Sequence, residues 1–235
     1  MGRFRAAAFI LFISLASVVL AGDTIFLRED FQALDNWKPL YFPKISAHTK
    51  YIAESESGSH YLKAESNASA SALVNTREID VYKYPKMKWR WKISNVYQKA
   101  VPGKKEGDDY PIRVYVLFKY DPERLGFLEK LKYSTAKLIY GEYPPDSTLS
   151  YVWASMAEAP LIAPSPYTNR ARLIALERGP VKTGRWVEES VDILADYRKA
   201  FGVDPPASAN IAIMNDSDNT GEKSVSYVST IEVFR

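Results

Sequence analysis

The sequence predicts a mostly β protein, an antiparallel β-sandwich of the jelly-roll, concanavalin-like or galactose-binding-like kind. Three observations lead to this prediction. Short segments that alternate apolar and polar residues, rich in Val, Ile, Tyr and Trp, recur from residue 23 to residue 235. Clusters of turn-forming residues separate these segments. The chain has no cysteine, so the strands must be held by core packing and not by disulfides.

The N-terminus has the pattern of a secretory signal peptide. Two arginines precede an apolar run over residues 6–20, which is shorter than the roughly 20 residues that a bilayer span requires. Small residues then occupy the positions that a signal peptidase reads. We therefore expect residues 1–22 to be a signal peptide and residues 23–235 to form one domain. The mature protein is expected to be periplasmic or secreted, with no transmembrane segment.

Charge and composition exclude several classes of partner. Removing the two arginines of the signal peptide lowers the formal charge from +3 to +1, and acidic and basic residues are interspersed. A nucleic-acid-binding surface usually needs clustered basic residues, so we expect no nucleic acid. The sequence has no glycine-rich phosphate-binding motif, and we expect no nucleotide. With no cysteine and only two histidines, neither of them in a metal-binding motif, no zinc is expected.

Nine segments show the alternation that is typical of strands. They cover residues 61–64, 70–74, 86–94, 112–120, 148–155, 170–177, 186–193, 209–214 and 225–234. Ahead of them, Glu29 to Phe31 followed by Trp37 fits a first strand and a turn that close one edge of a sheet. Nine short strands at this spacing favour a sandwich.

Two segments have helical periodicity instead. Over about residues 122–140, one set of residues recurs near spacings of three and four: Leu125, Leu128, Leu131, Thr135, Leu138 and Ile139. This periodicity predicts a helical insertion with one face packed on the body. A short helix is expected from about Ile193 to Phe201. Asp192 can cap its first turn, and Gly202 can end it.

The acidic run between the last two strands is the first candidate site, on what we expect to be a hairpin. Residues 215–221 read Asn-Asp-Ser-Asp-Asn-Thr-Gly, more oxygen-bearing side chains than a chain reversal needs. Asp216, Asp218 and Thr220 match the first half of a calcium loop, but Tyr227 stands where an EF-hand requires glutamate. Three interpretations of this run stay open: Ca²⁺ bound by these three residues in another geometry, a ligand-contacting loop, or a solvated, self-bonded turn.

A second polar set lies on two strands that we expect to pair across residues 95–109. Strand alternation places Arg113 and Tyr115 on one face, and antiparallel pairing would bring Arg90 to the same face. Asp108 and Asp109 would then lie at the rim. Guanidinium groups, carboxylates and an aromatic ring together suit a sugar, so these five residues form the candidate ligand-binding site. The alternative is an outer sheet face with cross-strand Arg-Asp pairs.

Several motifs follow one another in a recognisable order. They are Trp-Arg-Trp-Lys at 89–92, Gly-Asp-Asp at 107–109, Arg-Val-Tyr-Val at 113–116 with Phe118, Leu-Ser-Tyr-Val-Trp at 149–153, Gly-Arg-Trp-Val-Glu-Glu at 184–189, Asp-Tyr at 196–197 with Phe-Gly at 201–202, and Ile-Met-Asn-Asp-Ser-Asp-Asn-Thr-Gly at 213–221. In this order they resemble a bacterial family of exported proteins, domain of unknown function 3047. The resemblance covers nearly the whole mature chain. It implies a periplasmic or secreted domain and no established reaction.

These features favour an exported cell-envelope carbohydrate-binding protein whose partner is a polysaccharide or glycan. The step from fold to function is an analogy, because sandwiches host many activities. One alternative is a polysaccharide-active enzyme, a glycoside hydrolase or lyase that uses Asp109, Asp216 or Tyr115. A further alternative is a structural or assembly protein of the envelope.

Overall fold

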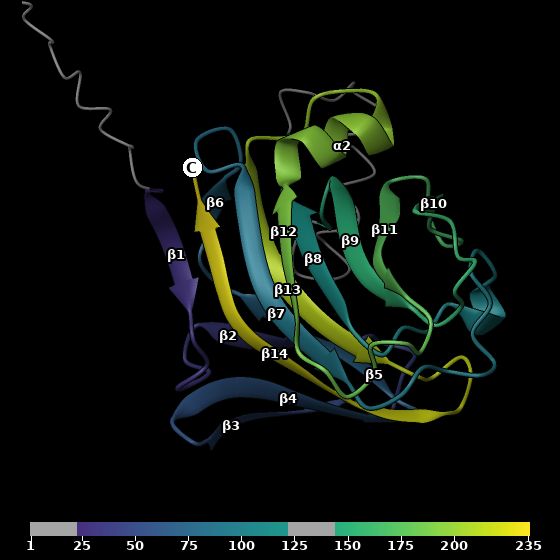
Figure 1. The fold of residues 1–235 in the computed structure, drawn as a ribbon. Coiled ribbons are helices and arrows are strands. Elements are labelled where there is room, and N and C mark those ends of the chain that lie inside the picture. Colours follow the sequence, from purple (N-terminus) through teal and green to yellow (C-terminus); the bar gives the residue numbers. More distant parts are fainter. Residues whose placement is uncertain (1–22, 122–143) are drawn as a thin grey trace, which may run out of the picture.

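The computed structural model describes residues 23–121 and 144–235. Two β-sheets pack face to face around a shared hydrophobic core (Figure 1), which confirms the predicted mostly β sandwich. The predicted signal peptide over residues 1–22 and the predicted helical insertion over residues 122–140 lie outside the described residues. Within the described residues, no helix has the length and apolar composition needed to cross a membrane.

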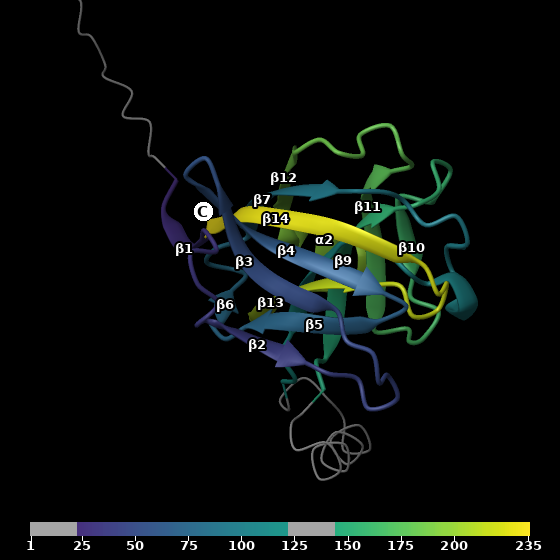
Figure 2. The same ribbon diagram turned by 90° about the horizontal axis from the view of Figure 1, so that it is seen from below.

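The first sheet, called sheet A, has the strand order β12-β7-β14-β4-β3, with β1 also paired to β14. Its strands are β1 (Ile25–Glu29), β3 (Lys50–Glu56), β4 (Ser59–Asn67), β7 (Lys86–Ile93), β12 (Val187–Asp192) and β14 (Lys223–Phe234). All pairs in this sheet are antiparallel. The long strand β14 is central, because β7 pairs along one of its edges and β4 and β1 pair along the other (Figure 2).

The second sheet, called sheet B, has the order β10-β11-β9-β8-β13-β5-β2, with β6 also paired to β13. Its strands are β2 (Trp37–Leu40), β5 (Ala70–Asn75), β6 (Ile79–Asp80), β8 (Arg113–Phe118), β9 (Ser147–Ala154), β10 (Ile162–Pro164), β11 (Ala171–Arg178) and β13 (Ser208–Asp216). The pair β11–β9 is parallel and the other pairs are antiparallel. The prediction of an antiparallel sandwich therefore holds with one parallel exception.

The core explains why these strands form. Trp89 and Trp91 of β7 are 1% and 0% exposed, and their rings meet edge to face with centroids 5.4 Å apart. From sheet B, Tyr151 and Trp153 pack against them with centroid distances of 5.5 and 6.0 Å. Large aromatic surfaces removed from water supply much of the stabilisation of a sandwich without disulfides.

Two local predictions are confirmed. The helix α2 spans Ile193–Phe201, Asp192 accepts a hydrogen bond from the backbone N–H of Ala195, and Gly202 ends the helix at φ 75°. In the first turn, Glu29 accepts hydrogen bonds from the indole N–H of Trp37 and the backbone N–H of Phe31, both at 2.9 Å. Each contact satisfies a polar group that would otherwise be unpaired at an element end.

Two predicted pairings are wrong. Strands β7 and β8 lie in different sheets, and so do β13 and β14, so residues 215–221 form an arch between the sheets and not a hairpin. The alternation of apolar residues identifies which face of a strand is buried, but not which neighbour receives its hydrogen bonds. In a sandwich, two successive strands can share a core from opposite sheets and show the same alternation.

The inward face of β14 changes phase along the strand. The alternation over residues 225–234 predicts that Val225 and Tyr227 point inward together with Ile231 and Val233. In the structure, Ser226 and Val228 point inward, while Val225 and Tyr227 lie on the outer face. The pairing with β7 shifts between Ser229 and Glu232, and this irregularity reverses the phase. The correction places Tyr227 on the surface of sheet A.

Candidate functional site

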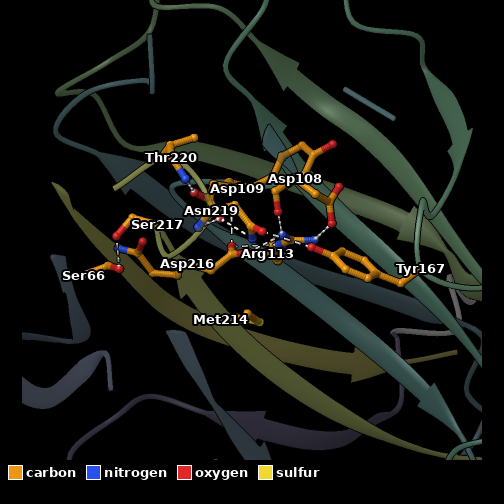
Figure 3. A network of polar contacts seen from close by, with 12 residues as sticks. Ser66, Asp108, Asp109, Arg113, Tyr167, Met214, Asp216, Ser217, Asn219 and Thr220 are labelled. Atoms are coloured by element: carbon orange, nitrogen blue, oxygen red, sulfur yellow. Dashed lines mark hydrogen bonds and ion pairs between the residues drawn. The ribbon is translucent and has the colours of Figure 1, made fainter. Parts of the chain in front are cut away.

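Four of the predicted polar residues meet where β8 begins and β13 ends (Figure 3). Asp108, Asp109, Arg113 and Asp216 are each at most 5% exposed, and we call them the Arg113 cluster. Arg113 pairs in register with Met214, two residues before Asp216, on the outer face of sheet B. The short 3₁₀ turn η1 (Lys105–Gly107) leads the chain directly to the two aspartates.

The guanidinium group of Arg113 donates its hydrogen bonds to groups inside the protein. Its Nε donates to Asp216 at 2.8 Å, and one terminal nitrogen donates both to the other oxygen of Asp216 and to the carbonyl oxygen of Asp108. The second terminal nitrogen lies 3.4 Å from the Asp108 carboxylate. The ring of Tyr110 covers the guanidinium, with 4.4 Å between its centroid and the Arg113 Cζ. Little of this guanidinium remains for a ligand.

Asp109 holds the arch between the sheets. Its carboxylate accepts hydrogen bonds from the backbone N–H and the side-chain amide of Asn219 at 3.3 and 3.1 Å, and from the backbone N–H of Thr220 at 2.6 Å. Asp109 is 1% exposed. Backbone N–H groups in a buried turn need such an acceptor, so this carboxylate has a structural role.

The rest of the arch is bonded to the body as well. The side chain of Asn215 accepts from Tyr97 and Ser224 and donates to the Ala64 carbonyl and to Ser226. Ser217 shares a hydrogen bond of 2.6 Å with Ser66 of β4. Asn215 therefore fills all four of its side-chain hydrogen-bonding positions in the interior, and the arch is held to the body by several hydrogen bonds.

The cluster carries more negative charge than its arginine compensates. Burial raises the pKa of Asp216 to about 7, although Arg113 acts in the opposite direction. Burial also raises the pKa of Asp108 and that of Asp218, and the Asp109 charge adds to both shifts. One carboxylate oxygen of Asp108 is buried and has no hydrogen-bond partner within the described residues. A further cation would relieve this excess charge.

The same carboxylates can hold a metal ion. Oxygen atoms of Asp109, Asp216 and Asp218 lie within 4.8 Å of one another, and oxygen donors are what a hard cation prefers. Two of the three predicted metal ligands are thus brought together. The third, Thr220, instead accepts a hydrogen bond from the backbone N–H of Glu222 at 3.4 Å.

The other two predicted ligand-binding residues lie elsewhere. Tyr115 follows Arg113 on the outer face of sheet B, half-buried, with its hydroxyl 3.6 Å from the sulfur of Met214. Burial raises its pKa to about 12. Arg90 belongs to β7 and lies on the outer face of the other sheet, so the expected cleft that joins Arg90 to Arg113 does not form.

Arg90 lies beside a group of aromatic side chains that no motif in the sequence marks as a site. Tyr61, Trp186 and Tyr227 are half-buried, and their ring centroids are 5.6 to 6.3 Å apart. Lys92 stands over Trp186 and Tyr227, 5.0 and 4.3 Å from their centroids, and the Arg90 Cζ lies 5.5 Å from that of Trp186. We call these five residues the aromatic-cationic surface.

The strand register shows how this surface continues across sheet A. Tyr227 pairs with Lys92 on one side and with Lys63 on the other. Two residues earlier on β14, Val225 pairs with Glu65, which pairs in turn with Lys50 of β3. Side chains two residues apart on a strand share a face about 7 Å apart, so the two rows are adjacent.

The second of these rows lines a groove of about 550 Å³. It lies at the end of sheet A, where β3 and β14 begin and β4 ends. Its walls carry hydroxyl, amide and charged groups: Ala47, His48, Lys50, Glu65, Ser66, Asn67, Ser69, Ser94, Asn95, Lys223, Ser224 and Val225. An adjoining hollow of about 470 Å³ shares Asn67, Asn95 and Lys223 and reaches Gly221 of the arch.

Comparison with known proteins establishes the family. Residues 35–232 match the model described as a protein of unknown function, DUF3047. The chain belongs to this family. The resemblance predicted from the ordered motifs is therefore confirmed. No curated protein sequence matches the chain.

Solved structures of similar shape are distant in sequence. One is a family 11 carbohydrate-binding module from Clostridium thermocellum in complex with a β-1,3-1,4-mixed-linked tetrasaccharide, with 11% identity, coverage of 90% of this chain and 95% of that chain, and a TM-score of 0.45. Lectin I-B4 from Griffonia simplicifolia, in its metal-free form, has 12% identity, covers 88% and 98%, and has a TM-score of 0.39.

Some residues of the site in this DUF3047 member carry a signal in the sequence, although the sequence does not predict them as site residues. Tyr167, on the connection between β10 and β11, donates to the amide oxygen of Asn219 at 3.2 Å, and no pattern around it predicts this contact. Trp186 lies in the quoted motif at 184–189, and Tyr61 and Tyr227 lie in predicted strands. The correct phase of β14 would have placed Tyr227 beside Lys92. The groove depends on loops whose position no local pattern specifies.

Proposed function

We propose that this protein is an exported cell-envelope protein that binds carbohydrate at the groove of sheet A. The observation that carries the proposal is the continuous surface along β4 and β14. It begins with the polar groove around Asn67 and ends at the aromatic rings beside Tyr227. The periplasm or the extracellular space is the proposed location, and a polysaccharide or glycan is the proposed partner.

The chemistry of this surface matches that of a sugar. A sugar ring has hydroxyl groups around its edge, which donate to carboxylates such as Glu65 and accept from amides such as Asn67. It also has apolar C–H faces, which pack on aromatic rings. The Arg113 cluster offers a poorer surface, because its carboxylates and guanidinium are buried and engaged in hydrogen bonds within the protein.

A binding assay on soluble polysaccharides tests the proposal. Affinity electrophoresis against neutral and acidic envelope and plant polysaccharides should retard the wild-type protein with at least one of them. Asn67→Ala and Glu65→Gln should weaken that binding about tenfold together, since two hydrogen bonds to the ligand are lost. Glu56→Gln, at the far end of β3, is the matched control and should bind normally. Absence of binding to every polysaccharide, with and without Ca²⁺, would contradict the proposal.

A second part of the proposal is that Asp109, Asp216 and Asp218 bind Ca²⁺. The excess of carboxylates over cations in the Arg113 cluster favours it. Because a ligand of the folded state raises apparent stability, millimolar Ca²⁺ should raise the melting temperature of metal-stripped wild-type protein. Asp218→Asn should abolish the increase, because it removes one of the three carboxylate ligands. Asp218 is chosen because it is the least buried of the three, so its substitution disturbs the fold least. A melting curve that Ca²⁺ does not move would leave the cluster with a structural role alone.

The geometry does not favour the enzymatic alternative at the residues named for it. Asp109 and Asp216 are 1% and 2% exposed and engaged in internal hydrogen bonds, and the Tyr115 hydroxyl faces a methionine sulfur. A general acid or base must reach the bond that it protonates or deprotonates. The assay that checks this is release of reducing ends or unsaturated uronates, compared between wild-type protein and Asp109→Asn.

A further inference from the structure

We infer that the ligand of sheet A is an acidic glycan, and that Arg90 and Lys92 bind the carboxylate of a uronic acid residue that packs on the aromatic-cationic surface. The inference rests on the proposed function and names the class of sugar. It concerns a surface distinct from the Arg113 cluster, in the other sheet.

The first observation is that neither cation forms an ion pair with a described residue, although Glu188 lies opposite Arg90 in the register of β12 and β7. Within the described residues, no carboxylate lies within 4.0 Å of Arg90 or of Lys92, whereas on the same face Lys63 has two such partners and Lys88 has one. Side chains of both residues reach over aromatic rings instead. Arg90 is exposed and Lys92 is half-buried, so both can pair with an anion from solution without breaking an existing ion pair.

The second observation is the position of the cations relative to the rings. Lys92 stands between Trp186 and Tyr227, and Arg90 lies beside Trp186 two residues along β7. A uronic acid has its carboxylate at the edge of the sugar ring, next to the C–H groups that pack on an aromatic surface. Cations over and beside an aromatic patch can therefore bind the carboxylate while the rings pack on the apolar face of the same sugar residue.

The remaining charges favour an acidic sugar over a nucleic acid. Glu54 and Glu65 flank Lys63 on this face, at 3.4 and 2.7 Å. Sugar hydroxyls can donate to these carboxylates, whereas a phosphodiester backbone has no donor for them and is repelled. The surface thus combines two free cations with hydrogen-bond acceptors, which suits a chain that carries both carboxylates and hydroxyls.

The test compares each acidic polysaccharide with its own neutral form. Polygalacturonate, alginate and hyaluronate are titrated into the protein by calorimetry, beside the same polymers whose carboxyl groups have been reduced to alcohols. We expect at least one acidic polymer to bind about tenfold or more tightly than its reduced form. Arg90→Gln with Lys92→Gln should remove this preference, and the charge-preserving pair Arg90→Lys with Lys92→Arg should retain most of it.

The chain provides a matched control for the double substitution. Arg77 and Lys83 also stand over aromatic rings, 5.5 Å from the centroids of Phe26 and Tyr84, and lie away from the groove. Arg77→Gln with Lys83→Gln removes the same charge from the same kind of contact. Its affinity for the acidic polymer should stay within about twofold of wild type, which separates the local contact from the net charge of the protein.

The outcomes separate this inference from the proposed function. Binding of neutral polysaccharide that depends on Asn67, with no preference for any acidic form, overturns the inference and leaves the proposed function standing. A preference for the acidic polymer that survives Arg90→Gln with Lys92→Gln also overturns the inference, because other residues then bind the carboxylate. Tighter binding of single-stranded oligothymidylate than of every polysaccharide overturns both. Loss of the preference only in the Arg90 and Lys92 double variant supports the inference.

Discussion

The Arg113 cluster and the aromatic-cationic surface use similar side chains in opposite ways. In the cluster, a buried arginine pairs with two aspartates and lies against the ring of Tyr110. On the surface, Arg90 and Lys92 lie against rings but have no carboxylate partner within the described residues. Both places have cations beside aromatic rings, and they differ in whether the charge is neutralised inside the protein.

This difference separates structural from functional roles. A buried ion pair holds its elements together, because loss of one partner leaves the other charge unpaired in a medium of low dielectric constant. An exposed cation adds little to stability and stays available to a ligand. Each of the following predictions therefore measures how far a charge contributes to folding, from the largest expected effect to the smallest.

Arg113→Met should have the largest effect on folding. The substitution keeps apolar volume but leaves Asp216 and Asp108 buried without their cation, which should cost about 3–5 kcal/mol of unfolding free energy. Urea denaturation monitored by tryptophan fluorescence measures the change, and Arg90→Met is the matched control on the other sheet. A loss of similar size for both arginines would contradict the contrast between the two regions.

Asp109→Asn should be destabilising by a smaller amount. The amide replaces one acceptor oxygen with a donor, so a backbone N–H of the arch loses its partner at a cost of about 1–3 kcal/mol. Hydrogen exchange at the Thr220 amide should accelerate, because that N–H now bonds to Asp109 at 2.6 Å. Asp30, which accepts from Gln32 in the exposed first turn, is the control, and Asp30→Asn should change stability little. An unchanged exchange rate at Thr220 would argue against the structural role of Asp109.

The sequence predicts those elements of the fold that depend on interactions between residues close together in the chain. The nine predicted strands, the helix Ile193–Phe201 and the inward tryptophans follow from local alternation and capping, and all are confirmed. The strands that these segments do not cover are short or lack a clear pattern: β6, β10 and β2 have two, three and four residues, and β3 is polar and half-exposed. A strand of that kind forms because a neighbour offers an edge, which its own residues do not encode.

The candidate site was only partly predictable for the same reason. The acidic runs of the sequence single out Asp109 and Asp216, but the convergence of these residues depends on β8 and β13 being neighbours in sheet B. The prediction that Arg90 shares a face with Arg113 is wrong because alternation identifies the buried face of a strand and not its partner strand. Because the phase of β14 reverses after Ser229, the alternation predicts that Tyr227 points inward, whereas it lies on the outer face. Pairing between distant segments decided each of these outcomes.

Glu189→Gln should sharpen the contrast within a single strand. Burial and the nearby Glu177 raise the pKa of Glu189 to about 7, while the neighbouring Glu188 points outward. The folded state then holds the proton to higher pH than the unfolded state, so stability falls as pH rises from about 4.5 to about 7. The substituted amide does not titrate and still accepts from Trp91, so the variant should gain about 1–2 kcal/mol over wild type at pH 8, after allowance for partial exposure.

The same variant should gain nearly nothing at pH 4.5, where Glu189 is largely protonated in the folded state and half-protonated in the unfolded state. Chemical denaturation at several pH values measures the slope, and Glu188→Gln is the control, with a pH dependence like that of wild type. A wild-type stability that does not decline between pH 4.5 and 7, or equal behaviour of the two variants, would show that the inward carboxylate is as well solvated as the outward one.

Lys92→Gln should have the smallest effect on folding of the substitutions considered. It removes contacts with two half-buried rings, and such a contact is worth about 0.5–1 kcal/mol at an exposed site. The melting temperature should therefore fall by only a few degrees, far less than for Arg113→Met. Raising the salt concentration should not change this difference much, because a cation over a ring has no ionic partner to screen. If instead Lys92→Gln destabilised the protein as strongly as Arg113→Met, the Lys92 charge would contribute as much to folding as the charge of Arg113. A free cation could then no longer be the basis for binding at this surface.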